Sequence, residues 1–485
     1  MNESPRHPGL APAAIRTNRL RTLASLLCAL GIGLPFGFLA AQPSLRPPRN
    51  PATLEALMAS GPHTTECERC HTAHGGSQVT VYPNALVGPD DNSLCQGCHN
   101  VPWQGGSYAT NPLYLGTSHG SRTSMIWPGP TPPARIEADA ATKCLNCHDP
   151  HGWTDALGAI PSLLLQREEA TCLACHDGSP ATINVRTDLL KAYRHPVTDY
   201  TGRHTGPKES LPADFATTPV AKRHSECADC HNAHVSRGDG VAPSGTAMSK
   251  QNLGVSRVAV VNGLAGSRPL YQFVAGSDTL TTPNAEYQLC FKCHSTWTTQ
   301  PTGQTDFATV LNPANPSFHP VESVGRNTNI RSGSFVIGWS ATSITRCGSC
   351  HGSDFGTVDG PHGSSYQYLL KKPYTASAAR RTMSSTEICF TCHDWNVYAN
   401  NSSSNTVKAY SRFNPSAESN GHTYHVSSQR VSCYSCHITH GSTSKSFLIV
   451  TGRNPGINTF TQTTNGGTCA PTCHGSESYT VNYAR

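Results

Sequence analysis

The apolar residues of this chain form one long run near its start and only short runs after it. Residues 23–40 are predominantly apolar, and Arg16, Arg19 and Arg21 precede them. A basic segment, an apolar segment and small residues ending at Ala41 are typical of a secretory signal that is cleaved from the mature chain. The alternative is an uncleaved N-terminal anchor, because the run nearly reaches the length that spans a bilayer. We predict cleavage and an exported protein, located in the periplasm or outside the cell.

Downstream of residue 41, the pattern predicts short elements separated by long polar loops. A helical pattern runs from Ser162 to His176, and similar shorter patterns lead into Cys290 and Cys389. Residues 255–261 and 271–274, with Asn-Gly directly after the first run, predict a β-hairpin. Four segments rich in Ser, Thr, Gly, Asn or Pro are expected to be surface loops: 124–135, 235–285, 296–345 and 395–432.

The composition is poor in the residues that build a core from protein alone. Hydrophobic residues make up 36% of the chain, while Gly and Pro number 42 and 36. Such a chain has little apolar surface to bury in proportion to its length. We therefore expect a mostly irregular coil, with short α-helices and a few β-hairpins, packed around a bound apolar group.

One short string, Cys-x-x-Cys-His, recurs along the chain and carries its chemistry. Of the 21 cysteines, all but Cys28 belong to ten such strings. We number them motif 1 (Cys67, Cys70, His71), motif 2 (Cys95, Cys98, His99), motif 3 (Cys144, Cys147, His148), motif 4 (Cys172, Cys175, His176), motif 5 (Cys227, Cys230, His231), motif 6 (Cys290, Cys293, His294), motif 7 (Cys347, Cys350, His351), motif 8 (Cys389, Cys392, His393), motif 9 (Cys433, Cys436, His437) and motif 10 (Cys469, Cys473, His474). Motif 10 has one additional residue between its cysteines.

The string is typical of c-type haem attachment. Two thiols add to the two vinyl groups of one porphyrin, and the His that follows lies beneath the iron as its proximal ligand. Zinc half-sites and redox dithiols also use Cys-x-x-Cys, but neither requires His after the second Cys ten times. We predict about ten covalently attached haem c groups, including one at motif 10.

Thirteen histidines remain outside the predicted signal and the motifs, close to one for each predicted iron. Four of them follow a proximal His by three residues, where they face away from their own iron and can reach a neighbouring one. We predict these sixth ligands: His63, His74, His119, His151, His195, His234, His319, His362, His425 and His440. His204, His224 and His422 are the alternatives.

The motifs repeat as five pairs: motifs 1–2, 3–4, 5–6, 7–8 and 9–10. In most pairs, one further His closely follows the first motif and another follows the second. The fourth pair departs from this pattern, because His362 replaces the His three residues on, and His422 or His425 is the later one. The fifth pair has His440 but no His after His474. Its missing ligand comes from earlier in the chain, comes from another subunit, or does not exist.

The arrangement resembles the multihaem cytochromes with doubled CXXCH motifs, a group related to the cytochrome c3 type, over about residues 60–475. The strings that carry the resemblance are 144–151, 227–234, the two His-Pro-Val strings at His195 and His319, and Gly-Pro-His-Gly at His362. The resemblance implies bis-histidine, low-spin haems in electron transfer. The longer spacer of motif 10 departs from the family's pattern.

The motif positions suggest a division of the chain. We predict a signal peptide at 1–41, haem groups 1–4 in residues 42–204, groups 5–6 in 205–324 and groups 7–10 in 325–485. The gaps near 205–222 and 325–345 are the expected boundaries.

An iron with two His ligands has no open site for a substrate, so it can only gain and lose electrons. We predict an electron carrier rather than an enzyme, with haems of low potential because their ligands are nitrogenous. Its expected acceptors are periplasmic or extracellular. Its expected partners are other cytochromes, membrane redox partners, or further copies of the chain in a filament. The alternative is a reductase of nitrogen or sulfur oxyanions, which would need an open iron at motif 10.

The net charge argues against a nucleic-acid partner. The formal net charge is +6, and the first 41 residues hold four Arg and one Glu, which leaves the remainder near +3. Two propionates on each haem would make the loaded protein acidic. We therefore predict no nucleic-acid partner.

Overall fold

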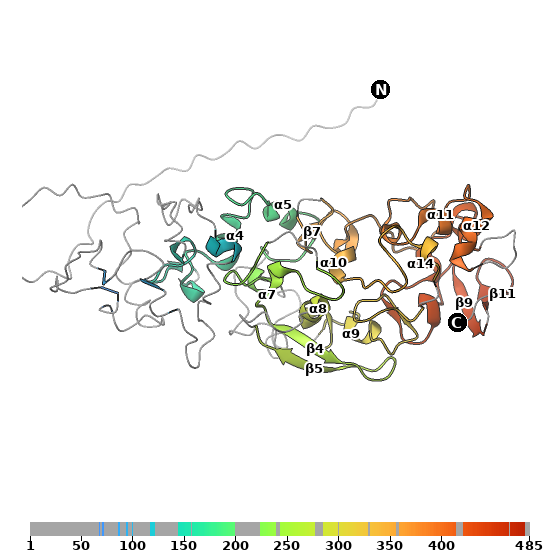
Figure 1. Cartoon of the computed structure of the whole chain (residues 1–485), viewed down its shortest axis with the longest axis horizontal. Helices are drawn as coiled ribbons and strands as arrows, with labels where there is room; N and C mark the ends of the chain where they lie inside the picture. The colour runs from blue at the N-terminus through green and yellow to red at the C-terminus, as the bar shows by residue number, and fades with distance from the viewer. Residues whose placement is uncertain are drawn as a thin grey trace, which may run out of the picture.

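The computed structural model describes the second half of the chain almost continuously and the first half in short pieces (Figure 1). The described residues are 67, 70–71, 86–87, 94–95, 99, 117–121, 144–156, 158–198, 224–238, 243–276, 285–298, 300–327, 330–355, 358–413, 421–464 and 466–480. The predicted signal, His63, His74, Cys98 and His204 lie outside them.

The described elements follow one another along the long axis of the molecule. In Figure 1, α4 (Glu168–Leu173) lies toward one end, α8 (Glu286–His294) lies near the middle, and β9 (Ile457–Thr463) lies at the other end. The chain therefore advances along the axis as it advances in sequence. No helix in the described part is long and apolar enough to cross a membrane.

Helices in the described part are short, as the composition predicted. The longest is α8, and most of the others are single turns. The α-helices are α3 (Ser118–Ser121), α4 (Glu168–Leu173), α5 (Val185–Leu189), α7 (Cys227–Cys230), α8 (Glu286–His294), α9 (Phe307–Val310), α10 (Cys347–Cys350), α11 (Trp395–Tyr398), α12 (Asn405–Lys408), α13 (Gly421–Thr423) and α14 (Cys433–Cys436). The 3-10 turns are η5 (Pro161–Leu163), η7 (Lys250–Asn252), η8 (Ser332–Ser334), η9 (Gln367–Leu369), η10 (Ile388–Thr391), η11 (Ala409–Ser411) and η13 (Ser446–Leu448), and η12 (Tyr424–Ser428) is a π-helical turn.

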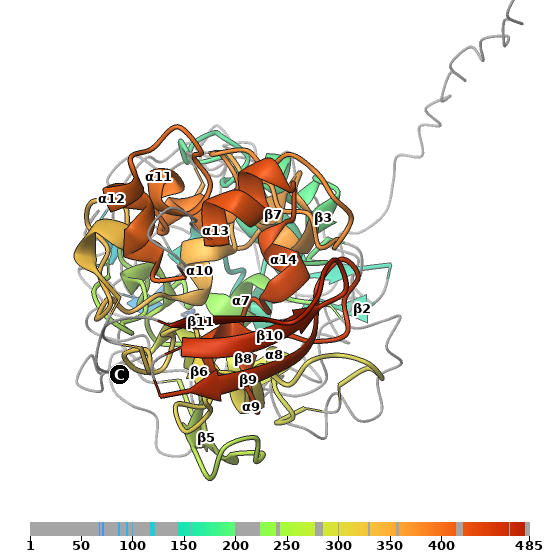
Figure 2. The same ribbon diagram turned by 90° about the vertical axis from the view of Figure 1, so that its right-hand side faces the viewer.

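The strands form small sheets, and two of these sheets join distant parts of the chain. The strands are β1 (Thr154–Asp155), β2 (Gly158–Ala159), β3 (Tyr193–Arg194), β4 (Arg257–Val261), β5 (Leu270–Val274), β6 (Ser317–Phe318), β7 (Gly363–Ser364), β8 (Gly441–Ser442), β9 (Ile457–Thr463), β10 (Gly466–Pro471) and β11 (Glu477–Thr480). Antiparallel pairs join β1 to β2, β3 to β7, β4 to β5 and β6 to β8. A three-stranded sheet in the order β11-β10-β9 closes the C-terminal end of the described chain (Figure 2).

The predicted hairpin is confirmed. β4 and β5 pair in an antiparallel register that places Val261 opposite Leu270. The Asn-Gly dipeptide begins the connection, and eight residues join the two strands. The hairpin lies inside the segment 235–285, which the sequence predicted to be largely a surface loop.

The helix predicted from Ser162 to His176 is wrong in its first half. Ser162 and Leu163 have φ of 59° and 55°, so they form a left-handed turn that cannot continue a right-handed helix. The N–H of Leu165 instead donates to the carbonyl of Cys147 at 2.9 Å. The helix begins only at Glu168, where two acidic residues in its first turn favour the positive end of the helix dipole.

The same left-handed turn occurs three times in the described chain. Tyr368 and Leu369 have φ of 63° and 57°, and Phe447 and Leu448 have φ of 60° and 56°. Each turn ends in Leu and is followed by an extended segment that pairs with a preceding motif. Leu164 bridges to His148, Leu370 to His351 and Ile449 to His437. This backbone conformation is costly for residues other than glycine, so its recurrence points to a shared role.

Apolar packing between side chains is confined to small clusters in the described residues. One contains Phe291, Ala308, Leu311 and Val321, and another contains Met383, Phe390, Ala399 and Val426. The remaining interior is a continuous cavity, with protein wrapped around it. The expected mostly irregular fold with short helices and small sheets is therefore confirmed for the described residues.

The left-handed turns make a prediction for stability. Ser162→Gly should raise the free energy of unfolding of the haem-loaded protein by about 1 kcal/mol, because a left-handed residue with a side chain costs about 1–2 kcal/mol. Ser244→Gly is the matched control, since Ser244 is exposed and is not among the residues with positive φ. It should lower stability slightly. Circular dichroism on heating measures both, and equal effects of the two variants would contradict the proposed strain.

Candidate haem-binding centre

Most of the described motifs form a single turn. Motifs 5, 7 and 9 are α7, α10 and α14, motif 6 ends α8, and motif 8 lies on η10. In each of the first three, the N–H of the His donates to the carbonyl of the first Cys, at 2.8–2.9 Å. Motifs 1, 3, 4 and 8 make the same bond at 2.8–3.0 Å.

Motif 10 is built differently. Cys469 lies on strand β10, where it pairs with Phe460 of β9 and Glu477 of β11, and Cys473 follows the end of the strand. The extra residue in the spacer fits this change, because an extended chain needs a different length to bring two thiols together.

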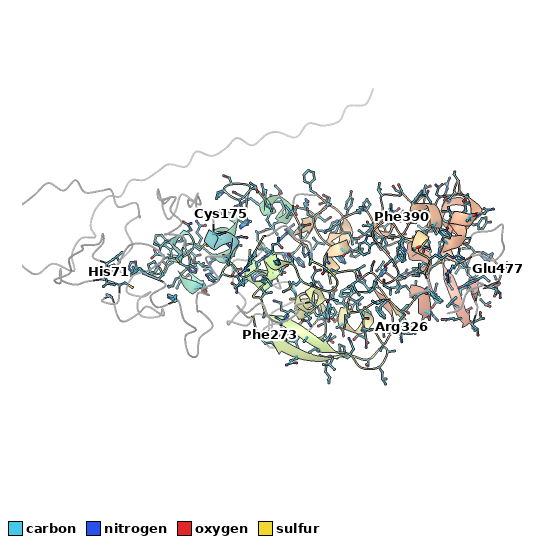
Figure 3. The ribbon with its side chains drawn as sticks, in the orientation of Figure 1. His71, Cys175, Phe273, Arg326, Phe390 and Glu477 are labelled. Atoms are coloured by element: carbon cyan, nitrogen blue, oxygen red, sulfur yellow. The ribbon has the colours of Figure 1, made fainter. Side chains whose placement is uncertain are left out.

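Motifs 2 to 10 open into one cavity of about 4040 Å³ that extends from Cys95 to Tyr479. A usual ligand pocket holds about 300–1,000 Å³, so this cavity has the volume of several. Its walls include cysteines and proximal histidines from motifs 2 to 10. Figure 3 shows the side chains of the described residues along the long axis of the molecule.

Across this cavity, proximal histidines face other histidines in pairs. Eight proximal rings each have a partner whose ring centroid lies 5.8–6.3 Å away. The pairs are His71–His151 (5.8 Å), His148–His234 (5.9 Å), His176–His119 (6.0 Å), His231–His362 (6.0 Å), His294–His195 (6.1 Å), His351–His440 (6.1 Å), His437–His422 (6.3 Å) and His474–His425 (6.1 Å). In a ninth case, His319 lies close enough to His393 to help burial lower the pKa of that ring. We call these non-motif partners the facing histidines.

Comparison with known protein families agrees with the motif pairs. Residues 61–102, 138–181 and 341–397 match the model of the Doubled CXXCH motif family. These segments contain motifs 1–2, 3–4 and 7–8. They are doubled CXXCH domains, and they indicate a multihaem c-type cytochrome. Searches among curated proteins and among solved structures gave no match.

The spacing of the rings fits a haem iron between them. Two imidazole nitrogens that each bind one iron at about 2 Å would hold their ring centroids about 6 Å apart. All eight measured separations agree with that value. The motif cysteines would hold the porphyrin covalently, and the proximal and facing histidines would approach its two faces.

Backbone carbonyls fix which nitrogen of each proximal ring is available. Nδ1 of His148, His351 and His437 donates to the carbonyls of Ser162, Tyr368 and Phe447, at 2.9, 2.8 and 3.0 Å. These carbonyls belong to the three left-handed turns. The bond leaves Nε2 as the free lone pair and orients the ring, which is how second-shell groups position metal-binding histidines.

Burial keeps the rings neutral, as metal binding requires. Burial, with further contributions from nearby histidines, lowers the pKa of His176, His234, His294 and His393 to about 4. The same causes lower the pKa of His440 to about 3. These imidazoles therefore remain unprotonated at neutral pH.

The facing histidines are themselves held in pairs by a repeated contact that we call the histidine bridge. Nδ1 of one His donates to the carbonyl of the residue that precedes another. His119 donates to Ala233 beside His234 at 3.1 Å, and His195 donates to Pro361 beside His362 at 2.6 Å.

Two further bridges complete the series. His319 donates to Thr439, the residue before His440, and its N–H also bonds the carbonyl of His440 at 2.8 Å. His425 donates to Gly421, the residue before His422, at 2.6 Å. The sheets β3–β7 and β6–β8 lie directly beside the second and third bridges, so these small sheets hold the facing histidines in place.

An ion pair occupies the position where motif 7 lacks the expected His. The residue three after the proximal His351 is Asp354 rather than His. Its carboxylate accepts from Lys191 Nζ at 2.6 Å, and the same Nζ lies 2.6 Å from buried Asp188. Asp354 therefore ties α5 to motif 7, while His362 supplies the facing ring.

The structure places most of the predicted ligands opposite a proximal His, and it adds one. His119, His151, His195, His234, His362, His425 and His440 each form a ring pair, and His319 lies near His393. His63 and His74 lie outside the described residues. His422 stood in the sequence only as an alternative to His425, but both face proximal rings. His224 lies 3.5 Å from the carboxylate of Glu226.

The sequence reasoning missed the carbonyl-bearing turns. The available signal was a short apolar string after several motifs: Leu-Leu-Leu at 163–165, Leu-Leu at 369–370 and Leu-Ile-Val at 448–450. The string at 163–165 was interpreted as the start of a helix.

The unusual motif 10 gives a direct test of haem attachment. Cys469→Ser with Cys473→Ser should lower the mass of the exported protein by one porphyrin, since the two thiols are the only covalent anchor that motif 10 offers. Intact-mass spectrometry with a pyridine haemochrome count measures the loss. Met383→Leu is the control, because Met383 is buried beside Cys433 without belonging to a motif. An unchanged porphyrin count in the double variant would show that motif 10 carries no haem.

Proposed function

We propose that the chain holds ten haem c groups, each between two imidazoles, and conducts electrons between partners outside the cytoplasm. The observation that carries this proposal is the set of eight ring pairs at 5.8–6.3 Å. Bound haem supplies a one-electron carrier. The chain supplies the attachment, the axial ligands and the apolar enclosure.

Closed irons favour electron transfer over substrate turnover. A facing His on each iron leaves no position for a substrate to bind. The alternative, an oxyanion reductase, depended on an open iron at motif 10. His425 lies opposite His474 with a centroid separation of 6.1 Å, and this supports a closed iron at motif 10.

The surroundings of the ligands favour low potentials. Each carbonyl that accepts from Nδ1 makes the imidazole a stronger donor to iron, which stabilises the oxidised state. Low-potential carriers suit the transfer of electrons to exterior acceptors, such as other cytochromes or membrane redox partners. A filament of several copies is a variant of the same function. c-type cytochromes are generally exported, which agrees with the predicted signal.

A regular rule describes how the chain supplies its facing histidines. Motifs 1, 3 and 7 each face a His that follows another motif, two places further along the chain, by three residues: these are the histidines after motifs 3, 5 and 9. Motif 5 faces His362, which follows motif 7. Motifs 4 and 6 face a His that lies upstream of the preceding motif. Neighbouring pairs of motifs therefore hold one another's ligands.

This rule can be tested at motif 7. His440→Ala should convert one iron to the high-spin state in the electron paramagnetic resonance spectrum of the oxidised protein, because His440 faces His351. The same change should add no high-spin signal in a background with Cys347→Ser and Cys350→Ser, which lacks that haem. His224→Ala serves as a control, since His224 lies beside Glu226. A new high-spin signal in the background variant would assign His440 to another iron.

The rule also selects a ligand for motif 2. The His that lies upstream of motif 1 in the sequence is His63, and by this rule it would face His99. We expect His63→Ala to produce one high-spin iron, whereas His74→Ala should leave the spectrum of a monomer unchanged. Electron paramagnetic resonance on both variants decides between them, and the opposite result would contradict the rule.

A further inference from the structure

Cysteines of successive motifs lie near one another at four places along the cavity. The first cysteines lie close enough for one thiol to raise the pKa of the other in the pairs Cys95–Cys144, Cys172–Cys227, Cys290–Cys347 and Cys389–Cys433. At three of these junctions the side chains also pack together, because Cys227, Cys347 and Cys433 lie against the apolar clusters that contain Leu173, Phe291 and Phe390, next to the preceding motif. These contacts join motif 2 to 3, 4 to 5, 6 to 7 and 8 to 9. Because each cysteine anchors one edge of its porphyrin, the anchored edges of these neighbours must be adjacent.

The proximal histidines of the same neighbours are also close. His99 acts electrostatically on His148, His231 on His176, His351 on His294, and His437 on His393. Hydrogen bonds join two of these junctions directly: the N–H of Ala228 in motif 5 donates to Glu168 of α4 at 2.6 Å, and the N–H of Gly348 in motif 7 donates to Glu286 of α8 at 2.7 Å.

A second kind of contact fills the alternate junctions. The thiol of Cys175 lies near Cys147, and that of Cys230 lies near Cys290. Cys350 lies near Cys389, and Cys436 lies near both Cys469 and Cys473. These contacts join motif 3 to 4, 5 to 6, 7 to 8 and 9 to 10. Every contact of either kind connects consecutive motifs.

The placement along the molecule agrees with these contacts. In Figure 1, α7, α8, α10 and α14, which carry motifs 5, 6, 7 and 9, follow one another along the long axis. In Figure 3, His71 lies toward one end and Glu477 toward the other. Residues 472–478, around motif 10, are all exposed.

We propose that motifs 2 to 10 form one unbranched file in sequence order, with motif 10 as its solvent-facing terminus. This inference rests on the proposed function and specifies the route that electrons take between the haem sites. Electrons enter and leave at opposite ends of the file, and each haem site exchanges only with the sites of the motifs before and after it. The exterior redox partner at the C-terminal end meets the exposed segment 472–478.

The path can be measured by trapping an electron at chosen positions. A photoreductant attached after Ser478→Cys injects one electron beside motif 10. A single trap is introduced by replacing one facing His with Met, which raises the potential of that iron alone. The four traps are His422→Met at motif 9, His440→Met at motif 7, His362→Met at motif 5 and His234→Met at motif 3.

We expect the trapping time, followed by transient absorption, to lengthen severalfold from each variant to the next in that order. Moving the photoreductant to position 190 by Leu190→Cys, near motif 4, should reverse the order of the His422→Met and His234→Met variants. Leu190 is 75% exposed, so the label has room. Equal trapping times, or an inverted order, would overturn the file.

Two controls separate this proposal from the function on which it rests. Electron paramagnetic resonance must first show one altered low-spin iron in each Met variant. No change there would contradict the assigned ligands instead of the order. Iron positions in an experimental density map of the unmodified protein give an independent measurement that needs no variant. The nearest neighbours of each iron must carry consecutive motif numbers, and a non-consecutive neighbour would refute the file.

Discussion

The gap between two facing imidazole rings is the constraint that shapes this protein. Eight such gaps lie at 5.8–6.3 Å, and in most of them the two rings come from segments that are far apart in sequence. His231 and His362 are one example, and His148 and His234 are another. The backbone therefore has to cross from one pair of motifs to the next, and small sheets such as β3–β7 are the places where it crosses. The predicted divisions at 204/205 and 324/325 stay predictions, but the bridge between His195 and His362 spans both of them.

The same constraint explains why so little regular structure is present in the described residues. A chain that packs against porphyrin needs carbonyls, thiols and rings at particular points, and long helices would place them at the wrong intervals. The side-chain clusters around Phe291 and Phe390 are small because most of the apolar contact is left for the bound groups. The left-handed turns at Ser162, Tyr368 and Phe447 are the clearest sign of this priority. There the backbone adopts a costly conformation in order to present a carbonyl to a proximal His.

The attachment sites could be predicted from the sequence because their geometry is local. Two cysteines and the next His are fixed by covalent spacing, so Cys227, Cys230 and His231 identify a site without any knowledge of the fold. The partner of each ring could not be predicted in this way, because it depends on contacts between distant segments. His422 and His425 illustrate the limit: the sequence offered them as alternatives, but a helical turn places one at motif 9 and the other at motif 10. The helix predicted at residues 162–167 was wrong for a similar reason. Leu164 and Leu165, which follow the turn at 161–163, pair with His148 and Cys147 instead of continuing into a helix.

The histidine bridge has a consequence for how the chain is made. A polypeptide is exported from its N-terminus, so the ring of His231 emerges well before that of His362, and His195 emerges well before the carbonyl of Pro361 to which it bonds. Under the proposed export, an early motif must therefore wait, half enclosed, until a much later stretch of polypeptide has followed it. Biogenesis is then vectorial, with each newly delivered segment closing the one before it. Motifs 4, 6, 9 and 10 escape the delay, because the His that faces each of them precedes it in the chain.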